Sequence, residues 1–128
     1  MRIIALIILK TLLFAGFSFA QSAEFKFEDD VYKFGKVSED SLLSFDYHFI
    51  NSGDAPLIIQ DIKVTCGCTV PTWPKAPIPP GGKGTIRVTF DTSGKIAYQE
   101  RTLEVHSNAR KSPYKLKFKG TVLNKKKG

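Results

Sequence analysis

The stretch that decides the fold is residues 43–49, which read Leu-Ser-Phe-Asp-Tyr-His-Phe. Apolar side chains occupy every second position, and polar side chains occupy the positions between them. Successive side chains of a β-strand point to opposite faces, so a period of two is typical of a strand with one buried and one solvated face. The stretch therefore predicts a strand whose apolar side faces a core.

Similar alternation recurs along the chain, with turn-forming residues between the repeats. The repeats fall within residues 25–37, 57–64, 86–90, 103–105 and 114–122. Segments rich in Gly, Pro and Asn separate them, and no window after residue 20 carries the i, i+3, i+4 apolar spacing of a helix. About seven short strands of this kind predict an all-β fold, an immunoglobulin-like β-sandwich.

The alternation also predicts which side chains fill the core. Leu57 and Ile59 share one parity, whereas Ile62 and Val64 share the other, so a bulge near Gln60 is needed to bury both pairs. The expected core residues are Phe45, Phe49, Ile62, Val88, Phe90, Val105 and Phe118.

Residues 1–20 have the features of an export signal. Arg2 precedes an apolar run, and Ser18-Phe19-Ala20 supplies small residues for a signal peptidase, although Lys10 leaves a retained anchor open. We expect a signal peptide at 1–20, one domain at 21–123 and a basic disordered tail at 124–128. No later segment is apolar enough for a transmembrane span, so the expected location is the periplasm, the cell surface or the medium.

The chain is basic, with a formal net charge of +7. Without Arg2 and Lys10, 17 basic and 12 acidic side chains remain, and the basic ones concentrate after Trp73. This asymmetry indicates either an anionic partner or two differently solvated ends of one domain. Export argues against nucleic acid.

Both cysteines lie in Cys66-Gly67-Cys68, and three readings of the pair are open. In an extended strand their Cα atoms would lie at the upper limit for a disulfide, but Gly67 can bend and shorten the separation. The pair is therefore a labile disulfide, a thiol or thiolate metal site, or two small side chains in a tight corner. A disulfide closing so small a ring would contribute little stability.

The rest of the sequence offers little support for a metal, a cofactor or catalysis. His48 and His106 fall on the polar parity of their strands and lack ligand spacing to the cysteines, and the only methionine is Met1. No nucleophile and base signature is recognisable, so we expect no enzyme, no metal and no cofactor.

Two surface features have competing readings. Thr69, Pro71, Trp73 and Lys75 form a candidate partner-binding loop, because a proline-stiffened loop presents an aromatic face rigidly. Trp73 can equally cap the core. Alternating lysines on the last strand, at 115, 117 and 119, suggest an anion-binding stripe or, by the reading we favour, protection of a sheet edge.

The chain resembles a family of short exported bacterial proteins of unknown function, whose immunoglobulin-like domain is related to Hydin-type and major-sperm-protein-type domains. The residues that carry the resemblance run from Phe34 to Val122, including Phe34-Gly35-Lys36-Val37, Asn51-Ser52-Gly53, Cys66-Gly67-Cys68-Thr69, Pro80-Gly81 and Gly120-Thr121-Val122. The chain departs from the family at Asp40 and Ala97, where glycine is frequent, and at Gln99, near which an aromatic residue is frequent. The resemblance implies a β-sandwich, export and no established catalytic role.

These observations predict an exported, non-catalytic binding or structural module of the bacterial cell envelope, whose partner is a protein or glycan. The alternative is a thiol redox or metal-handling protein that uses Cys66 and Cys68.

Overall fold

The alternating stretch forms the middle of β3 (Leu42–Asn51), the strand on which one of the two sheets is built. This computed structural model describes residues 21–125. Phe45, Tyr47 and Phe49 are buried, and the polar residues between them face outward. The other strands are β1 (Phe25–Phe27), β2 (Val31–Ser38), β4 (Ile59–Lys63), β5 (Thr69–Thr72), β6 (Lys83–Asp91), β7 (Ala97–Ser107) and β8 (Tyr114–Leu123).

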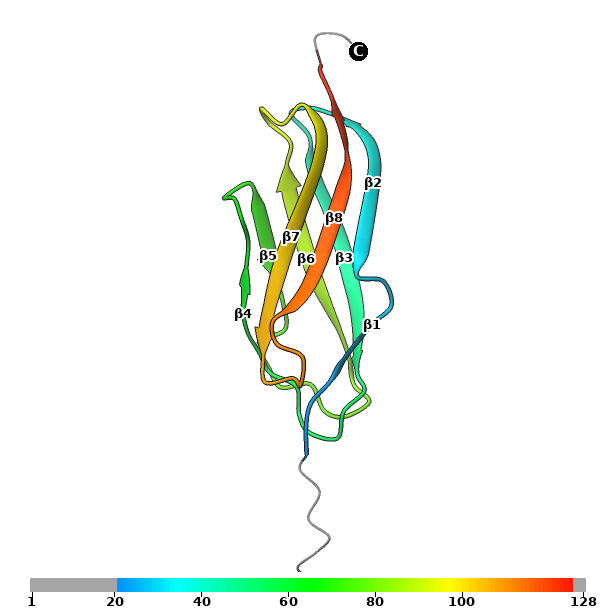
Figure 1. The fold of residues 1–128 in the computed structure, drawn as a ribbon, viewed down its shortest axis with the longest axis vertical. Helices are drawn as coiled ribbons and strands as arrows, with labels where there is room; N and C mark the ends of the chain where they lie inside the picture. Colours follow the sequence, from blue (N-terminus) through cyan, green and yellow to red (C-terminus); the bar gives the residue numbers. More distant parts are fainter. Residues whose placement is uncertain (1–20, 126–128) are drawn as a thin grey trace, which may run out of the picture.

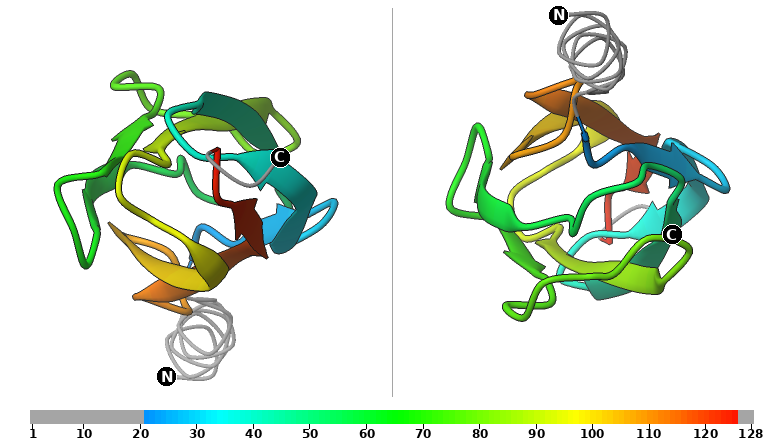
Figure 2. Two further views of the ribbon diagram at one scale, coloured as in Figure 1. Left: turned by 90° about the horizontal axis from the view of Figure 1, so that it is seen from above. Right: turned by 90° about the horizontal axis from the view of Figure 1, so that it is seen from below.

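The eight strands form two four-stranded sheets that pack face to face (Figures 1 and 2). Sheet 1 has the order β1-β3-β6-β5, and sheet 2 has the order β2-β8-β7-β4. All pairs are antiparallel except β2 and β8. The edge strands β4 and β5 lie on the same side of the sandwich, so residues 64–68 cross from one sheet to the other (Figure 1).

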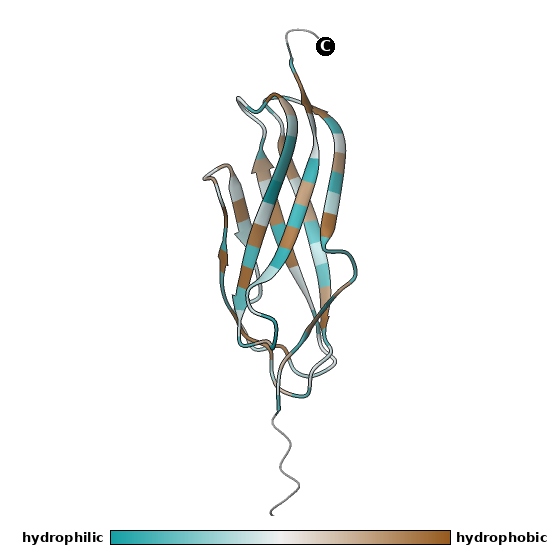
Figure 3. Cartoon of the chain, viewed as in Figure 1, coloured by the Kyte–Doolittle hydropathy of each residue, from teal (hydrophilic) through white to brown (hydrophobic). Residues whose placement is uncertain are grey.

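The core lies between the two sheets, and apolar and polar bands alternate along the strands (Figure 3). All seven residues expected in the core are buried, and the expected irregularity near Gln60 is a register shift between Ile59 and Asp61. Phe90 and Phe118 pack with ring centroids 5.0 Å apart across the sandwich. The all-β sandwich predicted from the alternation is confirmed.

The sandwich has eight strands where about seven were expected, since the chain changes sheets after Phe27: β1 pairs with β3, and β2 then pairs with β8. One expectation is corrected by the topology. The strand that carries Lys115, Lys117 and Lys119 lies between β2 and β7, so these lysines do not protect a sheet edge.

The terminal predictions lie largely outside the described residues. The proposed signal peptide, residues 1–20, and the last three residues of the expected tail, 126–128, are not described. Of the rest of that tail, Lys125 donates its backbone N–H to the carboxylate of Glu39. Across residues 21–125, the structure contains no helix of the length and hydropathy needed to cross a membrane.

Candidate functional site: the thiol corner and the outer face of sheet 1

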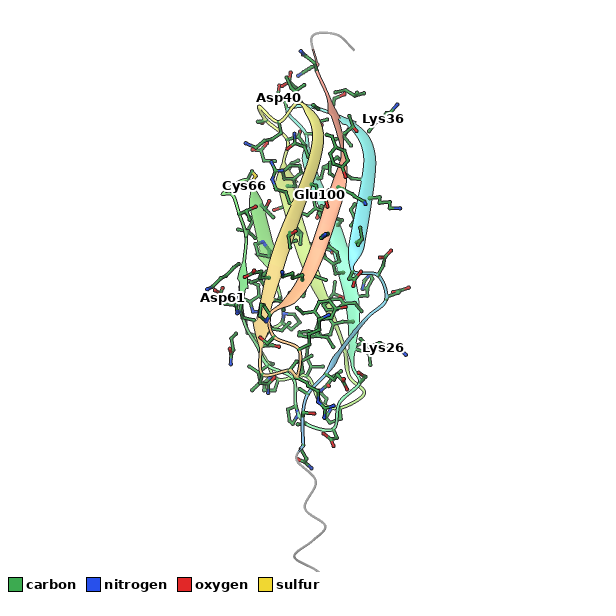
Figure 4. The ribbon with its side chains drawn as sticks, in the orientation of Figure 1. Lys26, Lys36, Asp40, Asp61, Cys66 and Glu100 are labelled. Carbon is green, nitrogen blue, oxygen red and sulfur yellow. A yellow bond between two sulfur atoms is a disulfide. The ribbon has the colours of Figure 1, made fainter. Side chains whose placement is uncertain are left out.

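Cys66 and Cys68 are joined by a disulfide at the turn between β4 and β5. Their Cα atoms lie 5.3 Å apart, well inside the usual range for a disulfide. Both cysteines are half-buried, and Cys66 lies at the tip of the corner on the β4 and β5 side (Figure 4). The sulfur atoms are bonded to each other, so in this state neither is available as a thiolate.

Thr69 contacts both sulfur atoms. Its hydroxyl oxygen lies 3.7 Å from Sγ of Cys66 and 3.8 Å from Sγ of Cys68, and its side chain is buried. Its backbone N–H donates to the carbonyl of Cys66 at 3.3 Å. One threonine thus closes the turn with its backbone and places a hydroxyl against the bridge.

The two histidines lie on the outer faces of different sheets. His48, on β3, has Nδ1 3.1 Å from the hydroxyl of Thr85, and His106, on β7, has Nε2 3.4 Å from a carboxylate oxygen of Glu104. Within residues 21–125, no three His, Cys, Asp or Glu side chains gather into a group suited to a metal ion. His48 is exposed, whereas Nε2 of His106 is buried and makes no hydrogen bond besides this 3.4 Å contact with the carboxylate.

The candidate loop residues mostly face the sandwich. Thr69 is buried, and Pro71 and Trp73, which share its parity, are half-buried. Trp73 packs against the core, its buried Nε1 has no hydrogen-bond partner, and the ammonium of Lys75 lies 3.3 Å from the centre of its ring. The large apolar side chain that β5 exposes is Val70, at 53%.

The free edge of β5 is poor in hydrogen-bond donors. The N–H of Asp91 donates to the carbonyl of Cys68, and the antiparallel ladder then turns the backbone groups of Val70 toward β6 and those of Thr69 and Pro71 toward the free edge. Proline has no N–H, and the N–H of Thr69 is already used in the turn. The edge therefore offers few backbone donors to an added strand.

The outer face of sheet 1 is rich in hydroxyl groups. The register of β3, β6 and β5 aligns Ser44, Thr89 and Val70 in one row and brings Thr72 into the next. In that next row Nε of Arg87 lies 2.9 Å from Oδ1 of Asp46, and this hydrogen-bonded pair lowers the pKa of the Asp46 carboxyl. The two charges neutralise each other, so the middle of the face is close to uncharged.

The face ends in a groove of about 620 Å³ over β1, β3 and β6. The register places Ile50 between Lys26 and Lys83, and places His48 beside Thr85. Ile50 is 37% exposed, so the groove has an apolar centre between two ammonium groups. Sequence reasoning did not identify this groove, although the outward parity of these residues is visible in the sequence.

The fold is similar to that of several solved structures. A Porphyromonas gingivalis W83 protein of unknown function is 15% identical, with a TM-score of 0.69 over 84% of this chain and 50% of its own length. The ASH/PapD-like domain of human CEP192 is 10% identical, with a TM-score of 0.64 over 80% of this chain and 87% of that domain. A Caenorhabditis elegans MSP family member, WR4, is 7% identical, with a TM-score of 0.51 over 78% of this chain and 98% of its own.

These similarities establish the fold alone, and this chain spans half of the P. gingivalis chain. At the sequence level, the model of a family described as a protein of unknown function, DUF1573, matches residues 25–122. No curated protein matches the chain.

Proposed function

Since the chain belongs to the DUF1573 family, whose function is unknown, we propose a role from the geometry: an exported, non-catalytic binding module of the bacterial cell envelope. Its partner contacts the outer face of sheet 1. The observation that carries this proposal is the hydroxyl-rich, nearly neutral middle of that face, with Val70 and Leu42 exposed and a groove at one end.

The composition of the face supports a binding role. The centres of protein interfaces are depleted of charged residues, and the charges in the middle of this face are the paired Asp46 and Arg87, whereas the opposite face carries several lysines. Leu42 is 73% exposed, the largest exposed fraction of the apolar side chains on the outside of the sandwich. The face therefore offers hydroxyl groups and apolar contacts that an uncharged protein or glycan surface can match.

The chemistry of the turn that holds Cys66 and Cys68 supports a non-catalytic role. The sulfur atoms are bonded to each other, and each lies within hydrogen-bond distance of a threonine hydroxyl, which is not a base at neutral pH. A disulfide is also compatible with an oxidising compartment, as the proposed export signal requires.

Photo-crosslinking in cells tests this proposal. Benzoyl-phenylalanine is placed at Val70 on the outer face of sheet 1 and, as a matched control, at the exposed Lys115 on the outer face of sheet 2. We expect a discrete adduct on irradiation from position 70 and none from position 115. An adduct from position 115 alone would refute the assignment of the face, and an exclusively cytoplasmic product would refute the envelope location.

The alternative role, thiol redox exchange, is favoured by one observation: a single buried hydroxyl lies close to both sulfur atoms. Exchange with an external dithiol would convert the bridge into two cysteine thiols while the dithiol becomes a disulfide. The Thr69 hydroxyl can donate a hydrogen bond to whichever thiolate forms. Alkylation and mass spectrometry after equilibration in graded dithiol buffers, with a metal assay of the reduced form, test this role. A bridge that stays oxidised throughout argues against it.

A further inference from the structure

A β-bulge in β2 places two lysines on one face. Residues three apart in a regular strand point to opposite faces, but the register of β2 against β8 shifts between Lys33 and Gly35. As a result Lys33 aligns with Lys119 and Lys36 aligns with Thr121, and both lysines lie on the outer side of sheet 2. Bulges commonly redirect side chains beside functional sites.

The bulge brings like charges together. Lys33 and Lys119 are register partners on neighbouring strands, an arrangement that destabilises a sheet when nothing compensates it. Within residues 21–125, neither forms an ion pair, whereas Lys117, two positions along β8, has its ammonium 3.8 Å from Glu100. Three lysines, Lys33, Lys36 and Lys119, therefore lie on the same part of this face, and none of them forms an ion pair among the described residues.

The three lysines line a shallow, open hollow of about 320 Å³. Gly35 and Gly120 lie in its lining, and Gly35 has a φ of +72° with open space where a Cβ would be. Tyr98, on β7, lines another side and is 59% exposed. In Figure 4, Lys36 extends outward from β2.

The nearby carboxylates are already engaged. Glu100 is the register partner of Lys119, but one of its oxygens lies near Lys117 and the other accepts a hydrogen bond from the Tyr98 hydroxyl at 3.2 Å. Asp29, beside Lys33, accepts the backbone N–H of Val31 at 3.0 Å. The hydrogen bond to Glu100 holds the Tyr98 ring next to the hollow.

We propose that this lysine hollow binds an acidic saccharide, with a carboxylate or phosphate substituent between the three ammonium groups and the sugar ring against Tyr98. Ammonium groups supply charge-assisted hydrogen bonds to the anion, and a restrained aromatic ring supplies apolar contact area at low entropic cost. The exposed ring of Tyr98 beside the lysines suits the face of a sugar, and the open shape of the hollow leaves room for the rest of a saccharide chain. This site lies on sheet 2 and does not depend on the partner surface of sheet 1.

A titration followed by amide NMR tests the proposal with the purified, disulfide-bonded protein. The probes are tetragalacturonate, the neutral maltotetraose as its uncharged counterpart, and phosphatidylglycerol vesicles. We expect saturable shifts at Gly35, Gly120 and Thr121 with tetragalacturonate and none with maltotetraose. Tyr98→Ala should weaken binding by about fivefold.

Charge variants separate the site from net charge. Lys33→Gln/Lys119→Gln should weaken binding by about tenfold, because two charge-assisted contacts are lost. The control Lys63→Gln/Lys115→Gln removes the same charge from the same face outside the hollow and should change affinity by about twofold or less. Since the first variant relieves like-charge repulsion, its melting temperature should be equal to or above that of the unmodified protein, which excludes unfolding as the cause.

Three outcomes would overturn the proposal. They are the absence of saturable shifts, equal weakening by both charge variants, and shifts at the hollow with vesicles but not with the saccharide. A fourth is equal binding of tetragalacturonate and maltotetraose, which would leave the lysines without a role.

Discussion

The carboxamide NH₂ of Asn51 donates to the backbone carbonyl of Ile78 across 3.0 Å in the interior of the sandwich end. The same group donates to the carbonyl of Ala55 at 2.8 Å, and its Oδ1 accepts the N–H groups of Gly53 and Glu24. The Asn51 side chain is fully buried. One side chain thus joins the end of β3 to the segment before β1 and to the loop before β6.

Asn51→Ala should lower the free energy of unfolding by about 3 kcal/mol or more, since several buried backbone groups would lose their partners at once. Urea unfolding measures this. The matched control is Asn108→Ala: Asn108 also makes two hydrogen bonds between segments, to Ile58 and Pro56, but it is exposed, so the expected loss is about 1 kcal/mol. Equal losses would contradict the importance of burial.

The sequence predicts the strands and the core, but it does not predict the role of the Asn51 side chain. Alternation around Phe45 and Phe90 predicts strands and core, because burial on one face is a local property of a strand. The composition around Asn51 indicates only a turn, because the groups that its side chain binds come from segments up to 27 residues away.

The site was less predictable than the core for the same reason. The order of strands in a sheet depends on pairing between segments that are distant in the sequence. Alternation alone therefore favours an edge position for the lysines of the last strand, although β8 is central. The bulge that brings Lys36 beside Lys33 appears only when β2 is paired with β8. In contrast, Cys66 and Cys68 are only two residues apart in the sequence, so their proximity is a local property. The disulfide is accordingly one of the three readings that the sequence supports.

Ala97→Gly should raise the free energy of unfolding by about 0.5 kcal/mol. Ala97 has a φ of 81°, a conformation that strains a residue with a Cβ, and the relief of that strain exceeds the added entropy of an unfolded glycine. Asp40, with a φ of 60°, is the other residue at which the resemblance led us to expect glycine. The control is Ala76→Gly. Ala76 is not among the residues with a positive φ, so glycine relieves no strain there and should lower the free energy of unfolding. Chemical denaturation of the three proteins checks the sign, and a destabilised Ala97→Gly would contradict the strain.

Stability should decrease above pH 10 because of Tyr47. Its hydroxyl donates to the carbonyl of Lys117 in the opposite sheet, and burial raises its pKa well above the ordinary value of 10.0. The unfolded chain releases the phenol proton near pH 10 while the folded chain retains it, so alkali favours unfolding. Urea unfolding between pH 8 and pH 11 should show a steeper loss for the unmodified protein than for Tyr47→Phe. Parallel curves would show that Tyr47 does not contribute.

The Cys66–Cys68 bridge should contribute little to global stability. It closes a ring of three residues, for which loop entropy predicts a stabilisation of about 1.6 kcal/mol, compared with about 4.7 kcal/mol for a ring of 100 residues. Cys68 packs only against the margin of the core, and the buried residues around Phe90 and Phe118 should hold the sheets together without the bridge.

Cys66→Ser/Cys68→Ser should therefore remain folded, with strand content unchanged by circular dichroism and a slightly lower melting temperature. The same loss should follow from reduction of the unmodified protein, while the serine variant should be insensitive to reductant. If reduction instead unfolded the whole sandwich, the bridge would be a structural element of the core. A reversible thiol role requires that the sandwich stay folded on reduction, because a protein that exchanges its bridge with an external dithiol must be folded in both oxidation states.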